Sequence, residues 1–281
     1  MAIIDGNVIE ATDVTPFGDR TDGVFNETSG TTNLVQGVVH QYSSFNLGAS
    51  ATLSASSTSE KPIIILVDGN CTIDGTIDLI GKGWPRYSCG ANKGYAAFSG
   101  VISGLDTFGW GTVGETGGTG GSGGRRGMKS WNFQELQSGF IMNGLGGADA
   151  AGTSAGIGVA GGATLYMLIR GTLTFGASST IDVSGANGEN GSATGGGGGG
   201  GGSGDIIIIV NGAITDNGVT KTKNGGTGGT ATGSVGGGGG GSSISDGGGA
   251  SNNGGNGAAG NEVIVAYDTI LWGGKGPYPA D

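Results

Sequence analysis

Short runs of β-branched residues recur along the chain, each followed by a Gly or Asn turn and a second apolar segment. IIILVDGNCTIDGTIDLIGKG (63–83) and IIIIVNGAITDNGVTKTKNGG (206–226) show the pattern in full. A continuous Ile/Val run is typical of a strand buried on both faces, whereas alternation is typical of a half-exposed strand. Neither segment has helical periodicity, so the pattern predicts strands and almost no helix.

Five segments share this order of strands. They are 38–56, 63–83, 165–188, 206–226 and 263–276. One such unit cannot bury its apolar side alone, but units stacked ~4.8 Å apart can. We therefore predict an all-β fold, a short parallel β-solenoid-like stack of strands. An antiparallel sandwich of the same strands is the alternative, and the long connections between matching strands favour parallel pairing.

Glycine lies mostly between these segments, in three excursions over 84–162, 189–205 and 225–262. All three begin at the same place in the repeat, so they should emerge at one edge of the stack and lie side by side. A flexible linker is one interpretation. A polyglycine II bundle, in which threefold helices bond laterally, is the other. Because each tract returns to the same stack, we favour the bundle, with 38–281 as scaffold and 1–37 as a lead-in or attachment segment.

Composition excludes several classes of protein. Although 70 of the 281 residues are glycine, they do not fall at every third position throughout, which excludes collagen. A net charge of −10 disfavours nucleic acid as a partner. No apolar run approaches the ~20 residues that span a bilayer, and residues 1–20 lack the pattern of a secretory signal. Cys71 and Cys89 form either one disulfide bridge or two buried thiols.

The side chains needed for catalysis are scarce, so we expect no enzyme, no metal site and no cofactor. His40 is the only histidine, and its strand-like context favours a structural role. Asp78 and Asp182 hold the same position in TIDL and TIDV. In neighbouring rungs they would lie about 5 Å apart, the spacing of a retaining glycosidase pair. A solvated ladder, neutralised by Lys221 or Lys223 or by a cation, is the favoured interpretation.

Aromatic residues are concentrated in the first excursion, which holds nine of the chain's 18, whereas the other two excursions hold none. Rigid aromatics among Gly, Ser and Asn, with arginines as polar partners, are typical of binding loops. The alternative is a local core, as WNFQELQSGF (131–140) indicates. The candidate binding residues are Trp84, Tyr87, Tyr95, Trp110, Arg125, Arg126 and Trp131, with Trp110 and Trp84 the strongest.

The combination of GTIDLIGKG (75–83), STIDVSGANG (179–188) and eight consecutive glycines (195–202) resembles glycine-rich phage tail proteins. It is similar to the distal tail-fibre adhesins of T-even-like phages, and TDGVFNETSGTTNLV (21–35) looks like a lead-in found in virion proteins. Those adhesins begin with a separate attachment domain, whereas here only about 35 residues precede the first segment. The resemblance implies a virion protein of the phage tail, extracellular after release, whose loops at the free end of the bundle meet the receptor. It implies a bacterial surface receptor (a glycan or an outer-membrane protein) and other tail proteins as partners, and leaves homo-oligomerisation open.

The favoured function is therefore a tail-fibre or tail-tip adhesin without membrane insertion. The alternative is a structural surface protein, such as a fibre, capsid-decoration or extracellular filament subunit, that binds no receptor. An ice-binding protein would need a flat array of threonines, and TKTK (220–223) is too sparse for one. An enzymatic tailspike ranks last.

Overall fold

The structure is a computed structural model, and it describes residues 17–85, 143–150, 155–192, 195–231, 236, 239–242, 247–248 and 252–266, with two short strands before them. Those two, β1 (Ala2–Ile4) and β2 (Asn7–Ile9), pair antiparallel. The other described strands form two sheets in which every pair is parallel, and the described residues contain no helix. The prediction of an all-β parallel stack is confirmed, and the antiparallel sandwich is excluded.

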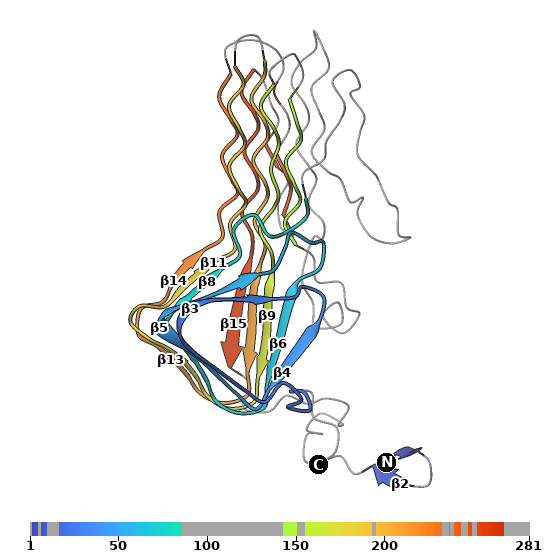
Figure 1. Cartoon of the computed structure of the whole chain (residues 1–281), viewed down its shortest axis with the longest axis vertical. Helices are drawn as coiled ribbons and strands as arrows, with labels where there is room; N and C mark the ends of the chain where they lie inside the picture. The colour runs from blue at the N-terminus through green and yellow to red at the C-terminus, as the bar shows by residue number, and fades with distance from the viewer. Residues whose placement is uncertain are drawn as a thin grey trace, which may run out of the picture.

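The two sheets face each other below a long bundle of extended chain (Figure 1). The five-stranded sheet has the order β15-β12-β9-β6-β4, and the eight-stranded sheet has the order β13-β10-β7-β5-β8-β11-β14, with β3 also paired to β5. The strands of the five-stranded sheet are β4 (Val39–Tyr42), β6 (Ile63–Val67), β9 (Leu165–Ile169), β12 (Ile206–Val210) and β15 (Glu262–Ala266). Those of the eight-stranded sheet are β3 (Val24–Leu34), β5 (Ser44–Ala55), β7 (Cys71–Ile73), β8 (Thr76–Asp78), β10 (Leu173–Phe175), β11 (Thr180–Asp182), β13 (Ile214–Asp216) and β14 (Thr220–Thr222).

Each rung passes from one sheet to the other. Strand β6 leads to β7 and β8, β9 leads to β10 and β11, and β12 leads to β13 and β14. In the rung that starts with β4, the long strand β5 takes the place of two short ones and pairs with both β7 and β8. Strand β3 pairs along β5 on the other side, so the stack begins inside the segment 1–37 that the sequence assigned to a lead-in.

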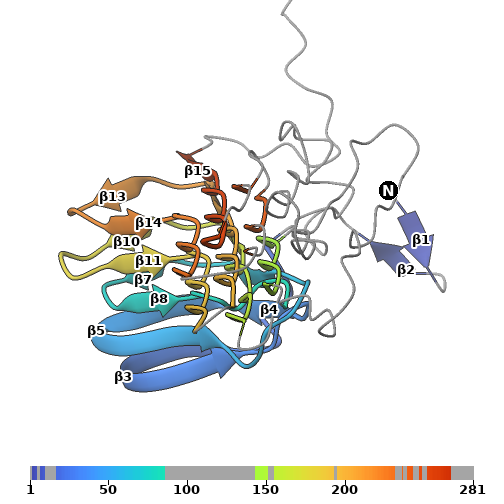
Figure 2. The same cartoon turned by 90° about the horizontal axis from the view of Figure 1, so that it is seen from above.

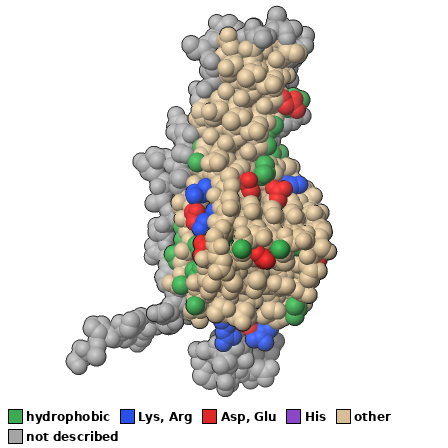
Figure 3. All heavy atoms as spheres, turned by 90° about the vertical axis from the view of Figure 1, so that its left-hand side faces the viewer, with side chains coloured by type: hydrophobic (Ala, Val, Ile, Leu, Met, Phe, Trp, Pro, Cys, Tyr) green, Lys and Arg blue, Asp and Glu red, His purple; other side chains and the backbone are tan. Residues whose placement is uncertain are grey.

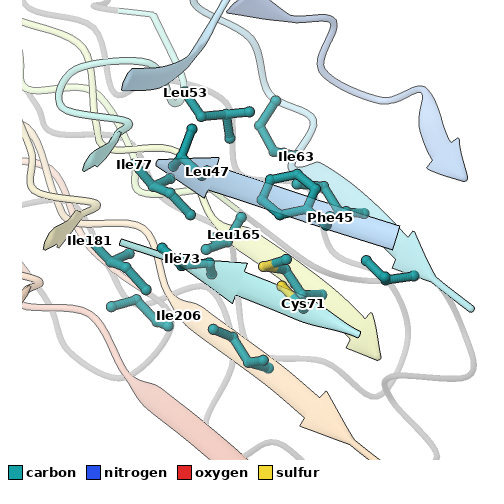
Figure 4. Packing of buried hydrophobic residues seen from close by; sticks show 14 of the residues in the cluster. Phe45, Leu47, Leu53, Ile63, Cys71, Ile73, Ile77, Leu165, Ile181 and Ile206 are labelled. Carbon is teal, nitrogen blue, oxygen red and sulfur yellow. The ribbon is translucent and has the colours of Figure 1, made fainter. Parts of the chain in front are cut away.

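The core lies between the two sheets and is built from columns of residues in matching register (Figure 4). Ile65, Met167 and Ile208 form one such column, and all three are fully buried. Strands β9 and β12 are buried at every position. Their second face belongs to another apolar cluster that includes Phe17, so the prediction of strands buried on both faces is confirmed for β9 and β12. In β6 the buried and half-buried positions alternate, and β15 is half-buried along most of its length.

The glycine-rich segments leave the stack along one edge and run side by side as a bundle, which Figure 2 shows viewed down its axis. We define its described runs as 143–150, 155–162, 184–191, 195–204, 224–231, 239–242, 247–248 and 252–260. The run 195–204 is central, because backbone hydrogen bonds join it to six of the other seven. It bonds to all but 247–248. The described parts of the three excursions therefore lie together, as their common starting point predicts.

Hydrogen bonds of the central run repeat every three residues. Three successive N–H groups donate to three different neighbours, and the cycle then starts again. Residues 197, 200 and 203 donate to 252, 255 and 258; residues 198, 201 and 204 donate to 189, 186 and 183; residues 199 and 202 donate to 148 and 145. This threefold period matches the pattern expected for polyglycine II. It agrees with lateral bonding and does not fit a flexible linker.

Close approach of backbones explains why the central run is glycine. A Cβ at Gly198 would lie 2.1 Å from the carbonyl oxygen of Ile157, and one at Gly201 would lie 2.1 Å from that of Ala160. Every described glycine with a positive φ lies outside the bundle runs. Glycine is thus required here by space rather than by a left-handed backbone.

Candidate functional site

The aromatic-rich part of the first excursion joins the scaffold at the base of the bundle. Its residues 86–142 lie outside the described part of the chain, but the residues that flank them are described. The Trp84 N–H donates to the Gly144 carbonyl oxygen at 3.1 Å, and the Gly161 N–H donates to the Trp84 carbonyl oxygen at 3.0 Å. The chain therefore departs and returns at neighbouring points, beside the residues that enter β9.

Asn143 anchors the returning end. Its side chain is buried, and its Nδ2 donates to the carbonyl oxygens of Ser59 and Lys61, each at 2.8 Å. Its Oδ1 accepts the N–H of Thr164 at 2.7 Å. A buried amide with this many partners costs free energy to displace, because each partner would be left unsatisfied. Asn143 thus fixes the end of the segment to two rungs of the stack.

Gln36 also bonds to the backbone at this junction. Its Nε2 donates to the carbonyl oxygens of Lys61 (3.1 Å) and Lys82 (2.7 Å), and its side chain is buried. Neither Gln36 nor Asn143 stands out in the sequence, because a lone amide carries no pattern along the chain. The only local signal is that Asn143 ends the aromatic-rich stretch and precedes a glycine.

Of the seven predicted binding residues, Trp84 alone lies in the described part of the chain. Trp84 is half-buried, and its backbone belongs to the base of the bundle. Tyr87, Tyr95, Trp110, Arg125, Arg126 and Trp131 lie outside the described residues. Among the described residues of the excursion, 143–150 and 155–162 form bundle runs. The described residues that flank the aromatic-rich part lie at the base of the bundle, and the predicted receptor-binding loops at its free end fall outside the described residues.

Charged side chains gather mainly over the stack, and most of the bundle face seen in Figure 3 is uncharged. On the last rungs, Glu262 lies 3.3 Å from Lys221 Nζ and 3.0 Å from Lys223 Nζ. Burial acts to raise the pKa of Glu262, but hydrogen bonds from Lys223 and Lys221 outweigh it and lower that pKa below its usual range. The pKa of Asp216 is also lowered, by backbone N–H groups of Val219 and Gly218 and then by Lys221.

The aspartate ladder is present, but the predicted lysine partners are not. Asp78 and Asp182 are register partners in β8 and β11. Each carboxylate accepts a backbone N–H two residues ahead, from Ile80 and Ser184 respectively. Lys221 instead occupies the register position of Ile181 and forms ion pairs with Asp216 and Glu262. The two aspartates therefore serve as local turn acceptors.

On the side of the stack away from the bundle, where β6 and β9 end, two arginines flank one buried carboxylate. Asp68 follows β6, and its side chain is almost inaccessible. Arg20 pairs with it from the turn before β3, and Arg170 Nη1 lies 2.9 Å from its other oxygen. Arg20 has φ +63°, a conformation that is uncommon outside glycine. The cluster joins the start of the stack to two later rungs.

The remaining candidates for chemistry are structural. His40 Nε2 lies 3.0 Å from the Val35 carbonyl oxygen, and its ring stacks on Tyr42. Cys71 is a free thiol, and burial raises its pKa far above the usual value, while Cys89 lies outside the described residues. Among the described residues no group of His, Cys, Asp and Glu is arranged to hold a metal ion. In the same residues, no helix is long and apolar enough to cross a membrane.

No family model matches the chain, and neither a curated protein nor a solved structure matches it significantly.

Proposed function

We propose that the chain is a phage tail adhesin that binds a component of a bacterial surface through its aromatic-rich segment, residues 86–142. The observation that carries the proposal is the fixed junction at Trp84, Asn143 and Gly144. Binding residues are commonly carried by connecting segments that a rigid scaffold positions. Here the segment with eight aromatics is closed at both ends by hydrogen bonds to a scaffold that is otherwise poor in aromatics.

The scaffold suits display at a virion surface. The stack buries a continuous apolar core, and the bundle is bonded in three lateral directions with few charged side chains. Such a body holds its shape without a large number of side chains. Together with the sequence resemblance, this supports a receptor-binding protein of the tail, acting outside the host cell beside other tail proteins.

Replacement of Trp110 by alanine tests the proposal. The purified chain is first screened on a panel of bacterial strains and on a glycan array to find a binding target. Truncation of a hot-spot aromatic typically costs ~2 kcal/mol or more, so Trp110→Ala should weaken binding about thirtyfold with little change in melting temperature. Trp84 is a poorer test, because its side chain is half-buried and its backbone is bonded to the base of the bundle. A substitution there would change the stability of the fold as well as binding.

Trp272→Ala is the matched control, since it removes the same side chain outside the segment. It should bind like the parent. Equal binding by Trp110→Ala and the parent, or loss of binding only in Trp272→Ala, would place the receptor site outside this segment. Failure of every strain and glycan to bind the parent chain would contradict the adhesin proposal itself.

A structural subunit is the second candidate, and exposed valines favour it. Val24, Val35, Val38 and Val39 are between 42% and 65% exposed, and all lie on β3, β4 or the turn between them. In the described sheets β3 pairs with β5 alone, and β4 with β6 alone. Open strand edges with apolar side chains are places where subunits join. Filaments or ordered oligomers in negative-stain images of the purified chain would favour this candidate.

A further inference from the structure

Four asparagines on the outside of the bundle hold the backbone of a neighbouring run. They are Asn187, Asn190, Asn253 and Asn256, and each is followed by glycine. Two lie on run 184–191 and two on run 252–260, in both cases three residues apart. Three residues make one turn of a threefold helix, so the two side chains of each pair point the same way.

The run between them, 224–231, donates backbone N–H groups to these side chains on both of its sides. On one side, the N–H groups of Thr227 and Thr230 donate to Oδ1 of Asn187 and Asn190, each at 2.8 Å. Thr230 also donates its hydroxyl to Asn190 at 2.9 Å. In the described runs no backbone carbonyl accepts these two N–H groups, so the asparagine side chains supply their acceptors.

On the other side, the N–H groups of Gly228 and Ala231 donate to Oδ1 of Asn256 and Asn253, each at 2.9 Å. The third direction faces inward, where Gly226 and Gly229 donate to the central run at 2.8 Å. All six consecutive N–H groups from 226 to 231 are thus bonded within the bundle. Thr227 and Thr230 are nevertheless exposed residues.

The glycine after each asparagine completes the contact. Gly188 and Gly191 donate their N–H groups to the carbonyl oxygens of Thr227 and Thr230, at 2.8 and 2.9 Å. Each Asn–Gly pair on this side therefore bonds both the N–H and the C=O of one residue. On the opposite side, Gly254 and Gly257 donate to the carbonyl oxygens of Gly229 and Gly226, both at 2.8 Å.

We propose that these four Asn–Gly pairs form a clasp, a site that binds an extended glycine-rich run through its backbone and closes the bundle to lateral addition of a second copy of this chain. An outermost polyglycine run otherwise presents N–H groups outward, as an edge strand does, and an edge of that kind recruits further chains. A second copy carries the same glycine runs, with carbonyl groups suited to those donors. In the clasp, asparagine side chains accept these N–H groups, so the donors are not left for a further glycine run.

A turn of the stack uses the same device once. Asn70 Oδ1 accepts both the N–H and the hydroxyl of Thr172, at 3.0 and 3.2 Å. Asn70 and Thr172 lie in neighbouring rungs, just before β7 and β10. An asparagine side chain thus bonds the backbone of an adjacent rung outside the bundle too. This proposal stands independently of the adhesin function, because it uses only contacts within the bundle.

Amide hydrogen exchange measured by NMR tests the clasp residue by residue. In the parent chain, the Thr227 and Thr230 amides should exchange slowly although both residues are exposed. Asn190→Ala should speed exchange at Thr230 about tenfold, as expected for loss of one hydrogen bond, and leave Gly229 and Ala231 unchanged. Asn224→Ala is the control, because Asn224 is an exposed residue of the same run whose side chain is not in the clasp.

The closing role is tested by sedimentation velocity on Asn187→Ala/Asn190→Ala beside Asn224→Ala. We expect the double variant to self-associate more than the control. Fast exchange of Thr227 and Thr230 in the parent, or equal exchange of Thr230 in Asn190→Ala and Asn224→Ala, would overturn the clasp. A double variant that folds and associates no more than Asn224→Ala would overturn the closing role. If the double variant does not fold, exchange in the parent and in Asn190→Ala still decides whether the clasp exists.

Discussion

Gly198→Val is the sharpest test of the bundle, because Gly198 lies in the middle of the central run. Its N–H donates to the Glu189 carbonyl oxygen at 2.9 Å, and its own carbonyl accepts the Gly229 N–H at 2.8 Å. A Cβ there would lie 2.1 Å from the carbonyl oxygen of Ile157 and 2.3 Å from its carbonyl carbon. The obstacle is backbone, so no side-chain rotation can relieve it.

The expected loss of stability follows from two effects. Forcing extra atoms into a packed interior costs about 1–3 kcal/mol. Separating run 195–204 from its neighbours also weakens the two hydrogen bonds of Gly198, each worth about 1 kcal/mol net. The sum is about 3–5 kcal/mol, or roughly 10 °C in melting temperature for a protein of this size. In a flexible linker the sign differs, because restricting a glycine of the unfolded chain is neutral or slightly stabilising.

Thermal unfolding followed by circular dichroism measures the effect. Ala259→Val is the matched control, since it adds a β-branched side chain to an exposed position of run 252–260. We expect the control to melt within about 2 °C of the parent. If Gly198→Val melts together with Ala259→Val, the tracts do not pack against one another, and the lateral bundle is wrong.

Two further predictions concern titratable groups. Glu262→Gln should lower the free energy of unfolding at pH 7, and its difference from the parent should shrink as the pH falls below about 4. The reason is that a carboxylate with a lowered pKa stabilises the fold above its unfolded-state pKa and loses that contribution as it is protonated. Urea unfolding at pH 7 and pH 3 measures both differences, and a constant difference would contradict the ion pair with Lys221 and Lys223. Cys71 should resist alkylation in the folded chain and react on unfolding, because burial raises its pKa and blocks access; peptide mass spectrometry distinguishes it from Cys89, and rapid labelling of folded Cys71 would show that the core is open.

Hydrophobic periodicity predicted the stack because burial and pattern agree in its interior strands. The runs over β9 and β12 consist of apolar residues at all five positions, and both are fully buried. Strand β3 was missed for the opposite reason. It lies at an edge, and only Phe25 and Leu34 of its 11 residues are buried, so most of its side chains are polar. An edge strand of this kind carries little of the pattern that marks an interior strand.

Side-chain partners were predicted less well than strands, because they depend on register between distant rungs. Lys221 and Lys223 were expected near the aspartate ladder, yet their partner Glu262 comes from the next rung, 39 or more residues later. The clasp was missed for a related reason. The spacing of asparagines in ANGENG (186–191) and NNGGNG (252–257) is visible in the sequence. The role of this spacing becomes clear only in the folded bundle, where a backbone N–H group lies beside each asparagine amide.

The order of strands in the two sheets explains how so much glycine can be ordered at all. Glycine loses more conformational entropy on folding than any other residue, so an isolated glycine run has little reason to order. Here runs 155–162, 195–204 and 252–260 lead into β9, β12 and β15, which are neighbours in the five-stranded sheet. Runs 184–191 and 224–231 leave from β11 and β14, which pair in the eight-stranded sheet.

The same neighbours remain bonded in the bundle. Gly162 donates to Gly202, and Gly200 donates to Gly255, repeating the order β9-β12-β15. Gly185, Gly188 and Gly191 donate to residues 224, 227 and 230, repeating the pair β11-β14. The apolar core thus fixes the starting points and the register of these runs. Each hydrogen bond between runs therefore forms between chains that are already held side by side. Because folding of the stack already aligns the runs, lateral hydrogen bonds and close packing need only outweigh the conformational entropy that the glycines lose on ordering.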